Sequence, residues 1–152
     1  QTMDDRGRVA VPAKLMPSFR ELAGADEKEP VEVIVCVTPD KRVGVFPRKV
    51  FMEMMEDMDK PAKVDRAIAK LRKAYLNHMD QQSLDKQNRI RIPAIMAEAF
   101  GLSGEVVMMG CGEFLEVVTR EEWRRKLFED TDTMDQGEAM LAAWRRQQEE
   151  RE

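Results

Sequence analysis

A thirteen-residue segment occurs twice in this chain, and the repeat limits the fold more than any other feature. Residues 1–13 read QTMDDRGRVAVPA and residues 82–94 read QSLDKQNRIRIPA, which align without a gap at a spacing of 81 residues (82 − 1). Both copies keep an aspartate, an arginine four residues later and a proline after two alternating β-branched residues. We therefore expect two similar halves that together bind something repetitive.

Composition and charge indicate a globular chain whose charges are sorted. The 152 residues are 43% hydrophobic and 36% charged, which suits one domain or two small fused ones. A formal net charge of −4 argues against a protein that coats nucleic acid through bulk charge, yet cations dominate both copies of the repeat. No apolar run reaches the ~18 residues of a transmembrane helix, and no signal-peptide pattern opens the chain. Two cysteines are too few for a disulfide framework, so we expect reduced thiols, no membrane association and a cytoplasmic location.

Each half is predicted to contain a strand, a turn, a second short strand, a short helix, a hairpin and a further helix. Gly7 and Asn88 stand at the same place in the two turns, and both residue types tolerate the positive φ of a tight turn. Pro12 and Pro93 stand where a helix can begin, while Pro17 is expected to delay the first helix. The Val-rich hairpin strands are predicted at residues 31–38, 43–46, 105–109 and 114–118.

The chain is predicted to divide into four parts. These are a first repeat over residues 1–61, a linker helix over 62–80, a second repeat over 81–128 and a C-terminal helical arm over 129–152. Asp59 and Pro61 supply the expected start of the linker helix, whose apolar stripe ends at Met79. Acidic and threonine residues at 130–135 predict a break in the arm before a second helix that contains Trp144.

The sequence predicts neither catalysis nor a metal site. His78 is the only histidine and is expected at the surface of the linker helix, so a catalytic triad has no base. Cys36 and Cys111 are too far apart for a zinc motif; we interpret Cys36 as a core residue and Cys111 as an exposed turn residue. Four methionines within residues 52–58 either fill the core, which is favoured, or form an adaptable interface. We therefore expect no enzyme, no cofactor and no small-molecule substrate.

The repeated motifs resemble those of a known family. MDDRGRVAVPAK at residues 3–14 and LDKQNRIRIP at residues 84–93 are similar to the paired Asp-x-x-x-Arg motifs of the MraZ family, regulators of the bacterial cell-division and cell-wall gene cluster. The Phe46–Pro47 step and residues 101–123 also match, so the resemblance covers about residues 1–127. It implies an α+β fold, a tandem-duplicated AbrB/MraZ-like swapped-hairpin β-barrel in one chain with flanking helices. Family members usually carry about ten more residues ahead of Gln1, so part of the first strand is expected to precede it.

The resemblance also implies a function and a partner. It implies a sequence-specific transcriptional regulator that binds short direct repeats of double-stranded promoter DNA upstream of a cell-division or cell-wall operon. Such proteins form homo-oligomeric rings, and a cytoplasmic, nucleoid-associated location follows. The DNA-contact candidates by motif position are Arg6, Arg8, Lys86, Arg89 and Arg91. The residues expected to orient the loops, rather than to touch phosphate, are Asp4, Gly7, Asp85 and Asn88.

Some of these residues allow an alternative interpretation. Asp4 can pair with Arg8 in a purely structural role, which would leave Arg6 as the contact. Arg91 either extends the basic face or is a solvated strand residue. The alternative function is an AbrB-like protein-interaction module of the antitoxin type, which binds a protein partner through the C-terminal arm. The duplication within one chain counts against that alternative.

Overall fold

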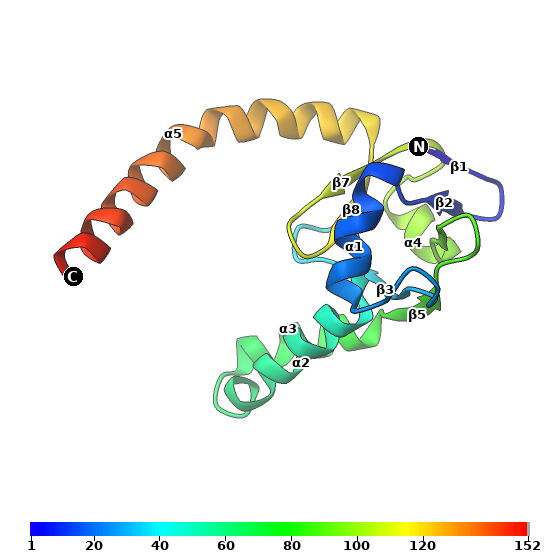
Figure 1. The fold of residues 1–152 in the computed structure, drawn as a ribbon. Coiled ribbons are helices and arrows are strands. Elements are labelled where there is room, and N and C mark those ends of the chain that lie inside the picture. The colour runs from blue at the N-terminus through cyan, green and yellow to red at the C-terminus, as the bar shows by residue number, and fades with distance from the viewer. Residues whose placement is uncertain (152) are drawn as a thin grey trace. The chain divides into compact units, whose positions relative to one another are not determined.

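The computed structural model describes residues 1–151, which divide into two units, residues 1–119 and the helix that begins at Arg120. The first unit holds the strands and most of the helices (Figure 1). Its elements in chain order are β1 (Thr2–Met3), β2 (Arg8–Ala10), the 3-10 turn η1 (Ala13–Leu15), α1 (Met16–Ala23), β3 (Glu32–Val37), β4 (Val43–Pro47), α2 (Arg48–Ala62), α3 (Arg66–Asn77), β5 (Asp80–Ser83), β6 (Arg89–Arg91), α4 (Ala94–Ala99), β7 (Gly104–Gly110) and β8 (Leu115–Thr119). The second unit is α5 (Arg120–Arg151).

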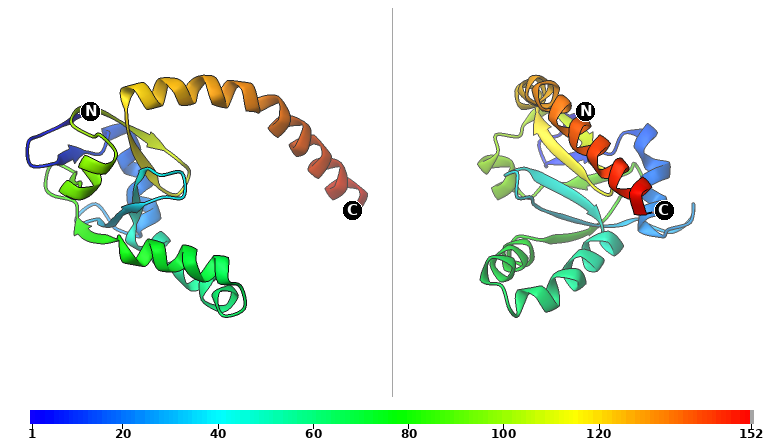
Figure 2. Two further views of the ribbon diagram at one scale, coloured as in Figure 1. Left: turned by 180° about the vertical axis from the view of Figure 1, so that it is seen from behind. Right: turned by 90° about the vertical axis from the view of Figure 1, so that its left-hand side faces the viewer.

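The two halves exchange their edge strands. Six strands form one antiparallel sheet in the order β1-β7-β8-β4-β3-β5, and β2 pairs with β6 separately. Strand β1 of the first half pairs with β7 of the second, with Thr2 opposite Glu105. Strand β5 of the second half pairs with β3 of the first, with Ser83 opposite Glu32. Figure 2 shows the curl of this sheet from two further sides. The predicted α+β, swapped-hairpin fold is confirmed.

A pseudo-two-fold axis passes between β4 and β8, where the halves meet. Val43 pairs with Val117 and Val45 with Leu115. The second hairpin follows the first at a spacing of 72 residues (115 − 43), so Val43 corresponds to Leu115 and Val45 to Val117. The two-fold rotation therefore exchanges one pair with the other. Gly44 and Glu116 face each other at the axis. A Cβ on Gly44 would lie 2.6 Å from Cγ2 of Thr38, so this position requires glycine.

The β3 strand is buried on both faces, which explains its unbroken apolar sequence. Val33 and Val35 point into the main core inside the curled sheet, whereas Ile34 and Cys36 point into a second core under α2 and α3. The second core contains Phe51, Met55 and Tyr75, and the other methionines of α2 pack against it. Burial raises the pKa of the Cys36 thiol to about 12. The interpretations of Cys36 and of the methionines as core residues are therefore confirmed.

The predicted hairpins and the late start of the first helix are also confirmed, but the linker helix begins elsewhere. Helix α2 continues past Asp59 and Pro61 because Met55 and Met58 extend its apolar face, and Pro61 falls within its last turn. Helix α3 instead begins after Asp65, whose carboxylate accepts hydrogen bonds from the amides of Ala67 (2.9 Å) and Ile68 (3.3 Å). The prediction missed this N-cap because Pro61 is also a common helix-start residue.

Helix α5 is continuous from Arg120 to Arg151, so the predicted break at residues 130–135 is wrong. The acidic and threonine side chains bond within the helix instead of competing with it. Lys126 Nζ lies 2.9 Å from both oxygens of Asp130, and the Thr131 hydroxyl donates to the Leu127 carbonyl at 2.8 Å. No α5 residue within the described part is buried. None of the described helices has an apolar stretch long enough to span a bilayer.

Candidate nucleic-acid interface

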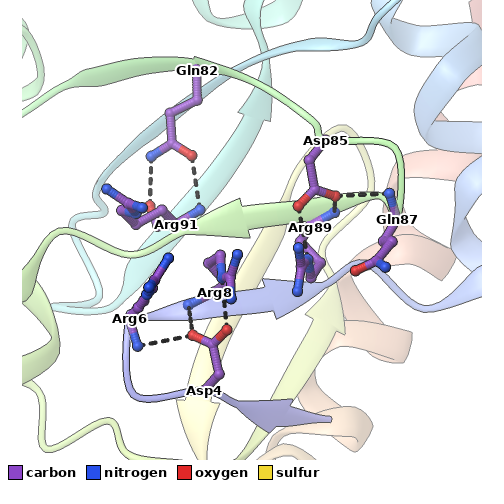
Figure 3. A network of polar contacts seen from close by, with 8 residues as sticks. All are labelled: Asp4, Arg6, Arg8, Gln82, Asp85, Gln87, Arg89 and Arg91. Atoms are coloured by element: carbon purple, nitrogen blue, oxygen red, sulfur yellow. Dashed lines mark hydrogen bonds and ion pairs between the residues drawn. The ribbon is translucent and has the colours of Figure 1, made fainter.

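The two copies of the repeat meet as a two-stranded antiparallel ribbon. Arg8 lies opposite Arg91, Val9 opposite Ile90 and Ala10 opposite Arg89. Side chains alternate along a strand, and Val9 and Ile90 are 0% and 1% exposed because they face the core. The other face of the ribbon therefore carries three arginines and one alanine. Figure 3 shows Arg8, Arg89 and Arg91 over this ribbon with Arg6 beside them.

In the first copy, the Asp4 carboxylate organises the turn and holds one arginine. Its Oδ1 accepts hydrogen bonds from the amides of Arg6 (3.0 Å) and Arg8 (2.8 Å), and its Oδ2 accepts from Arg8 Nε at 2.7 Å. Gly7 has a φ of 78°, and a Cβ there would lie 2.8 Å from the Ile92 carbonyl oxygen. Both the positive φ and the close approach require glycine at this turn.

The second copy repeats this arrangement atom for atom. Asp85 Oδ1 accepts from the amides of Gln87 and Arg89, each at 2.9 Å, and Oδ2 accepts from Arg89 Nε at 2.7 Å. Asn88 takes the place of Gly7 with a φ of 58°. The four residues that the sequence indicates as loop-orienting thus lie in two matching turns. The ion pair considered between Asp4 and Arg8 is present, and Asp85 and Arg89 form its counterpart.

Hydrogen bonding keeps both carboxylates ionised. The amide of Arg8 lowers the pKa of Asp4 most, and the Arg8 guanidinium and the Arg6 amide lower it further against partial desolvation. For Asp85, desolvation raises the pKa, but the amide and guanidinium of Arg89 outweigh it, so the pKa is lowered. An ionised carboxylate only accepts, so each aspartate fixes its arginine through Nε. Among residues 1–151, the outer guanidinium nitrogens are left free to bind elsewhere.

Each turn is also tied to the strand of the other half. The Ile92 amide donates to the Gly7 carbonyl and the Val11 amide to the Asn88 carbonyl, each at 2.8 Å. The ribbon is thus held in place before any partner binds. Such pre-organisation reduces the entropy that binding would otherwise cost.

The remaining candidates lie around the edge of this face. Arg6, Lys86 and Arg91 are exposed. Sequence reasoning missed Gln82, whose side-chain Oε1 accepts from the Arg91 amide at 2.8 Å while its Nε2 donates to the Arg91 carbonyl. Its position at the start of the repeat, matched by Gln1, is the one signal that could have pointed to it.

Residues weighed for other chemistry lie away from this face. His78 is exposed at the C-terminal end of α3, as expected. Cys111 is half-buried rather than exposed, and its Sγ lies 3.4 Å from Oε1 of the buried Glu116. Within residues 1–151 we find no cluster of three His, Cys, Asp or Glu residues arranged to hold a metal ion.

Comparisons with known proteins give one consistent result. The family model described as "MraZ protein, putative antitoxin-like" matches residues 75–149. The Transcriptional regulator MraZ of Saccharopolyspora erythraea is 31% identical over 128 residues, which cover 84% of this chain and 82% of that protein. The proteins of the same name from Corynebacterium jeikeium and Methylococcus capsulatus are 29% and 27% identical. Those matches cover 93% and 82% of this chain, and 92% and 78% of the two relatives.

Proposed function

This chain belongs to the MraZ family, and on that premise we propose that it is a DNA-binding transcriptional regulator whose β2–β6 ribbon contacts DNA. The observation that carries the proposal is the outward face of the ribbon, where two arginines are each held by an aspartate. Because Nε of Arg8 and Arg89 is occupied, the terminal nitrogens of each guanidinium form the edge that is left for a ligand. That edge pairs with O6 and N7 of guanine or with two phosphate oxygens.

The shape and charge of the ribbon suit a duplex. A two-stranded ribbon fits the major groove, which is about 12 Å wide. The overall charge of −4 does not oppose this role, because five cations lie in the two copies of the repeat. Each phosphate that they neutralise steepens the salt dependence of binding by a slope of about 0.9. We assign Arg8 and Arg89 to guanine-containing positions and Arg6, Lys86 and Arg91 to the edge of the contact.

The target is a set of short direct repeats upstream of a cell-division or cell-wall operon, bound by a homo-oligomeric ring. Repeats spaced by about ten base pairs present the same groove edge to successive protomers. Linked protomers make later contacts intramolecular, which raises avidity by about 10²–10⁴. In this proposal the repeats at residues 1–61 and 81–128 form one DNA-binding unit at the nucleoid. The linker at 62–80 and the arm at 129–152 do not touch DNA.

A mobility shift with the full chain and the DNA upstream of its own gene tests the proposal. We expect Arg8→Ala/Arg89→Ala to abolish binding without lowering the thermal unfolding temperature. The matched control, Arg66→Ala/Lys70→Ala, removes the same charge from exposed positions of α3 and should leave the shift unchanged. Binding retained by the first variant with an unchanged salt slope would remove both arginines from the DNA contact.

The antitoxin-type alternative has one observation in its favour, the exposed apolar side chains of α5. Phe128 is 72% exposed, Met140 71% and Trp144 56%. A partner protein that covered this helix would bury them. If the wild-type chain shifts no duplex at low salt, this alternative replaces the DNA-binding proposal.

A further inference from the structure

The backbone of the β2–β6 ribbon has a local two-fold symmetry. Adding 81 to residues 8 and 10 gives 89 and 91, so the pair Arg8–Arg91 is exchanged with the pair Arg89–Ala10. The two hydrogen bonds between the halves, each 2.8 Å long, are exchanged in the same way. By its backbone alone, the ribbon would present the same surface to DNA in either direction.

The side chains break this symmetry. Three exchanged positions differ in charge, with Asp5 matched to Lys86, Arg6 to Gln87 and Ala10 to Arg91. The end of the ribbon at the turn of residues 4–7, here called the first end, therefore gathers Arg6, Arg8 and Arg91. The second end, at the turn of residues 85–88, has Lys86 and Arg89. Counting the aspartates of each turn, the formal charge is +1 at the first end (3 − 2) and +1 at the second (2 − 1). The ends differ in where the cations lie, not in net charge.

The surroundings of the two turns differ as well. A cavity of about 740 Å³ opens at the first end, where Arg6 and Arg91 line it together with Asp4, Asp5 and small residues of α4 and the loop that follows. The matching hollow at the second end is about 350 Å³ and is lined in part by Glu27 and Glu29. Nη1 of Arg20 holds that acidic loop by donating to the carbonyls of Asp26 and Glu29. The first end is thus the roomier one.

Arg6 and Arg91 are positioned through their backbones, while their guanidinium groups stay open. Asp4 Oδ1 holds the Arg6 amide and Gln82 holds both backbone groups of Arg91. Within residues 1–151, neither guanidinium takes part in an ion pair. Asp4 accepts hydrogen bonds from the Arg6 amide through Oδ1 and from Arg8 Nε through Oδ2. Among the described residues that line the cavity, Asp5 is then the carboxylate that no arginine binds. Two unpaired guanidinium groups on one cavity match the oxygens of a phosphate.

We propose that the cavity between Arg6 and Arg91 takes one backbone phosphate of duplex DNA, so that the ribbon lies on DNA in one direction only. This inference rests on the proposed function and deepens it. The bound element is not palindromic, and the first end always faces the same side of it. Direct repeats follow, because protomers related by a ring rotation then meet DNA in the same orientation.

The salt dependence of binding tests the shared phosphate. The probe is a short duplex enriched by the full-length protein from a random pool. Because Arg6 and Arg91 contact one phosphate, Arg6→Ala/Arg91→Ala should lower the slope of log K against log salt by about 0.9. A fall of about 1.8 would mean two separate phosphates, and no fall would remove both residues from DNA. Either result overturns the cavity site.

Directed cleavage tests the orientation. In a Cys111→Ser background, Ile95→Cys carries an iron chelate on α4, a helix that borders the first-end cavity, and Cys36 is buried. We expect the wild-type ribbon to cut the duplex on one side of the element. Exchanging the side chains with Arg6→Gln, Gln87→Arg, Ala10→Arg and Arg91→Ala keeps the net charge, leaves the first-end cavity without its arginines and should abolish the one-sided cutting. Equal cutting on both sides by the wild-type ribbon overturns the polarity.

Two controls separate the outcomes. If the four-residue exchange does not fold, Arg6→Gln with Gln87→Arg alters exposed turn positions only and should weaken the one-sided cutting. Suppose that the wild-type protein binds DNA, that Arg8→Ala/Arg89→Ala does not, and that the wild-type ribbon cuts both sides equally. This combination disproves the polarity and leaves the proposed function standing. A wild-type protein that enriches no duplex disproves the proposed function itself.

Discussion

The carboxylates of Asp4 and Asp85 fix the direction of Arg8 and Arg89 without removing their charge from the DNA-binding face. The variant Asp4→Asn/Asp85→Asn separates these two effects. The Oδ1 atom of an asparagine can still accept hydrogen bonds from the backbone amides of the turn. In the wild type, the carboxylate Oδ2 lies 2.7 Å from the arginine Nε. In the variant this place is taken by the asparagine amide nitrogen, and two donors cannot form a hydrogen bond. We expect the turns to persist and the two guanidinium groups to lose their orientation.

The expected magnitude follows from what an oriented arginine does at a base. A bidentate contact to guanine discriminates by about 1–3 kcal/mol, and about 1.4 kcal/mol, toward the lower end of this range, is tenfold per arginine. The Asn variant should therefore lose about a hundredfold in the ratio of affinities for the target duplex and a scrambled duplex. Its net charge rises from −4 to −2 (−4 + 2), so binding to scrambled DNA should not weaken. By contrast, Arg8→Ala/Arg89→Ala removes both cations and should lose binding to the target and the scrambled duplex alike.

Competition fluorescence anisotropy between 50 and 200 mM salt, roughly the range over which phosphate contacts dominate affinity, measures both quantities. Thermal unfolding of each variant shows whether the turns survive. An unchanged affinity ratio in a folded Asn variant would refute the reasoning, because the carboxylates would then shape the turns without aiming the arginines.

Two further predictions concern stability. Thr38→Val removes the 2.9 Å hydrogen bond from a buried hydroxyl to the buried Glu116 carboxylate. We expect the free energy of unfolding, measured in urea, to fall by about 1–2 kcal/mol. The control Thr2→Val, at an exposed strand position, should cause no loss. The lowered pKa values of Asp4 and Asp85 mean that the unfolded chain binds protons more readily than the folded one. The contribution of these carboxylates to the free energy of unfolding is therefore complete above the ordinary pKa of 3.8, and it is lost as pH falls through the folded pKa values. Thermal unfolding from pH 7 to 2 should show this loss in the wild type and a smaller one in Asp4→Asn/Asp85→Asn; equal acid sensitivity of the two proteins would contradict it.

Local chemistry made most of the strands and turns predictable. Gly7 and Asn88 share a tolerance of positive φ, and both take it. The valine-rich sequences of β3 and β4 predict a hairpin because β-branched residues favour strands and Pro39 and Asp40 favour a turn between them. The start of the linker helix was less predictable, since Asp59 and Asp65 both look like N-caps. Only the apolar face that continues through Met55 and Met58 decides between them.

The candidate site was predictable in its residues but not in its contacts. The spacing of four between Asp4 and Arg8 allows an ion pair, and it does not say which nitrogen the pair uses. The use of Nε depends on the turn, which brings Asp4 Oδ1 onto two amides and so aims Oδ2 at the side chain. Gln82 and Arg91 are nine residues apart in the sequence. Their hydrogen bonds were not predictable because only the folding of β5 and β6 brings the two residues together.

The fusion of two halves in one chain permits differences that a symmetric dimer of separate chains does not. In such a dimer, identical residues must meet at the two-fold axis. Here Gly44 faces Glu116, and the carboxylate lies beside Thr38 and Arg42. Two glutamates at that axis would repel each other in the core, at a cost of several kcal/mol for an unpaired buried charge. The same freedom lets Arg6 differ from Gln87 and Arg91 from Ala10. A duplicated chain can therefore acquire a directional DNA-binding face on a symmetric backbone, which two identical subunits around one axis cannot.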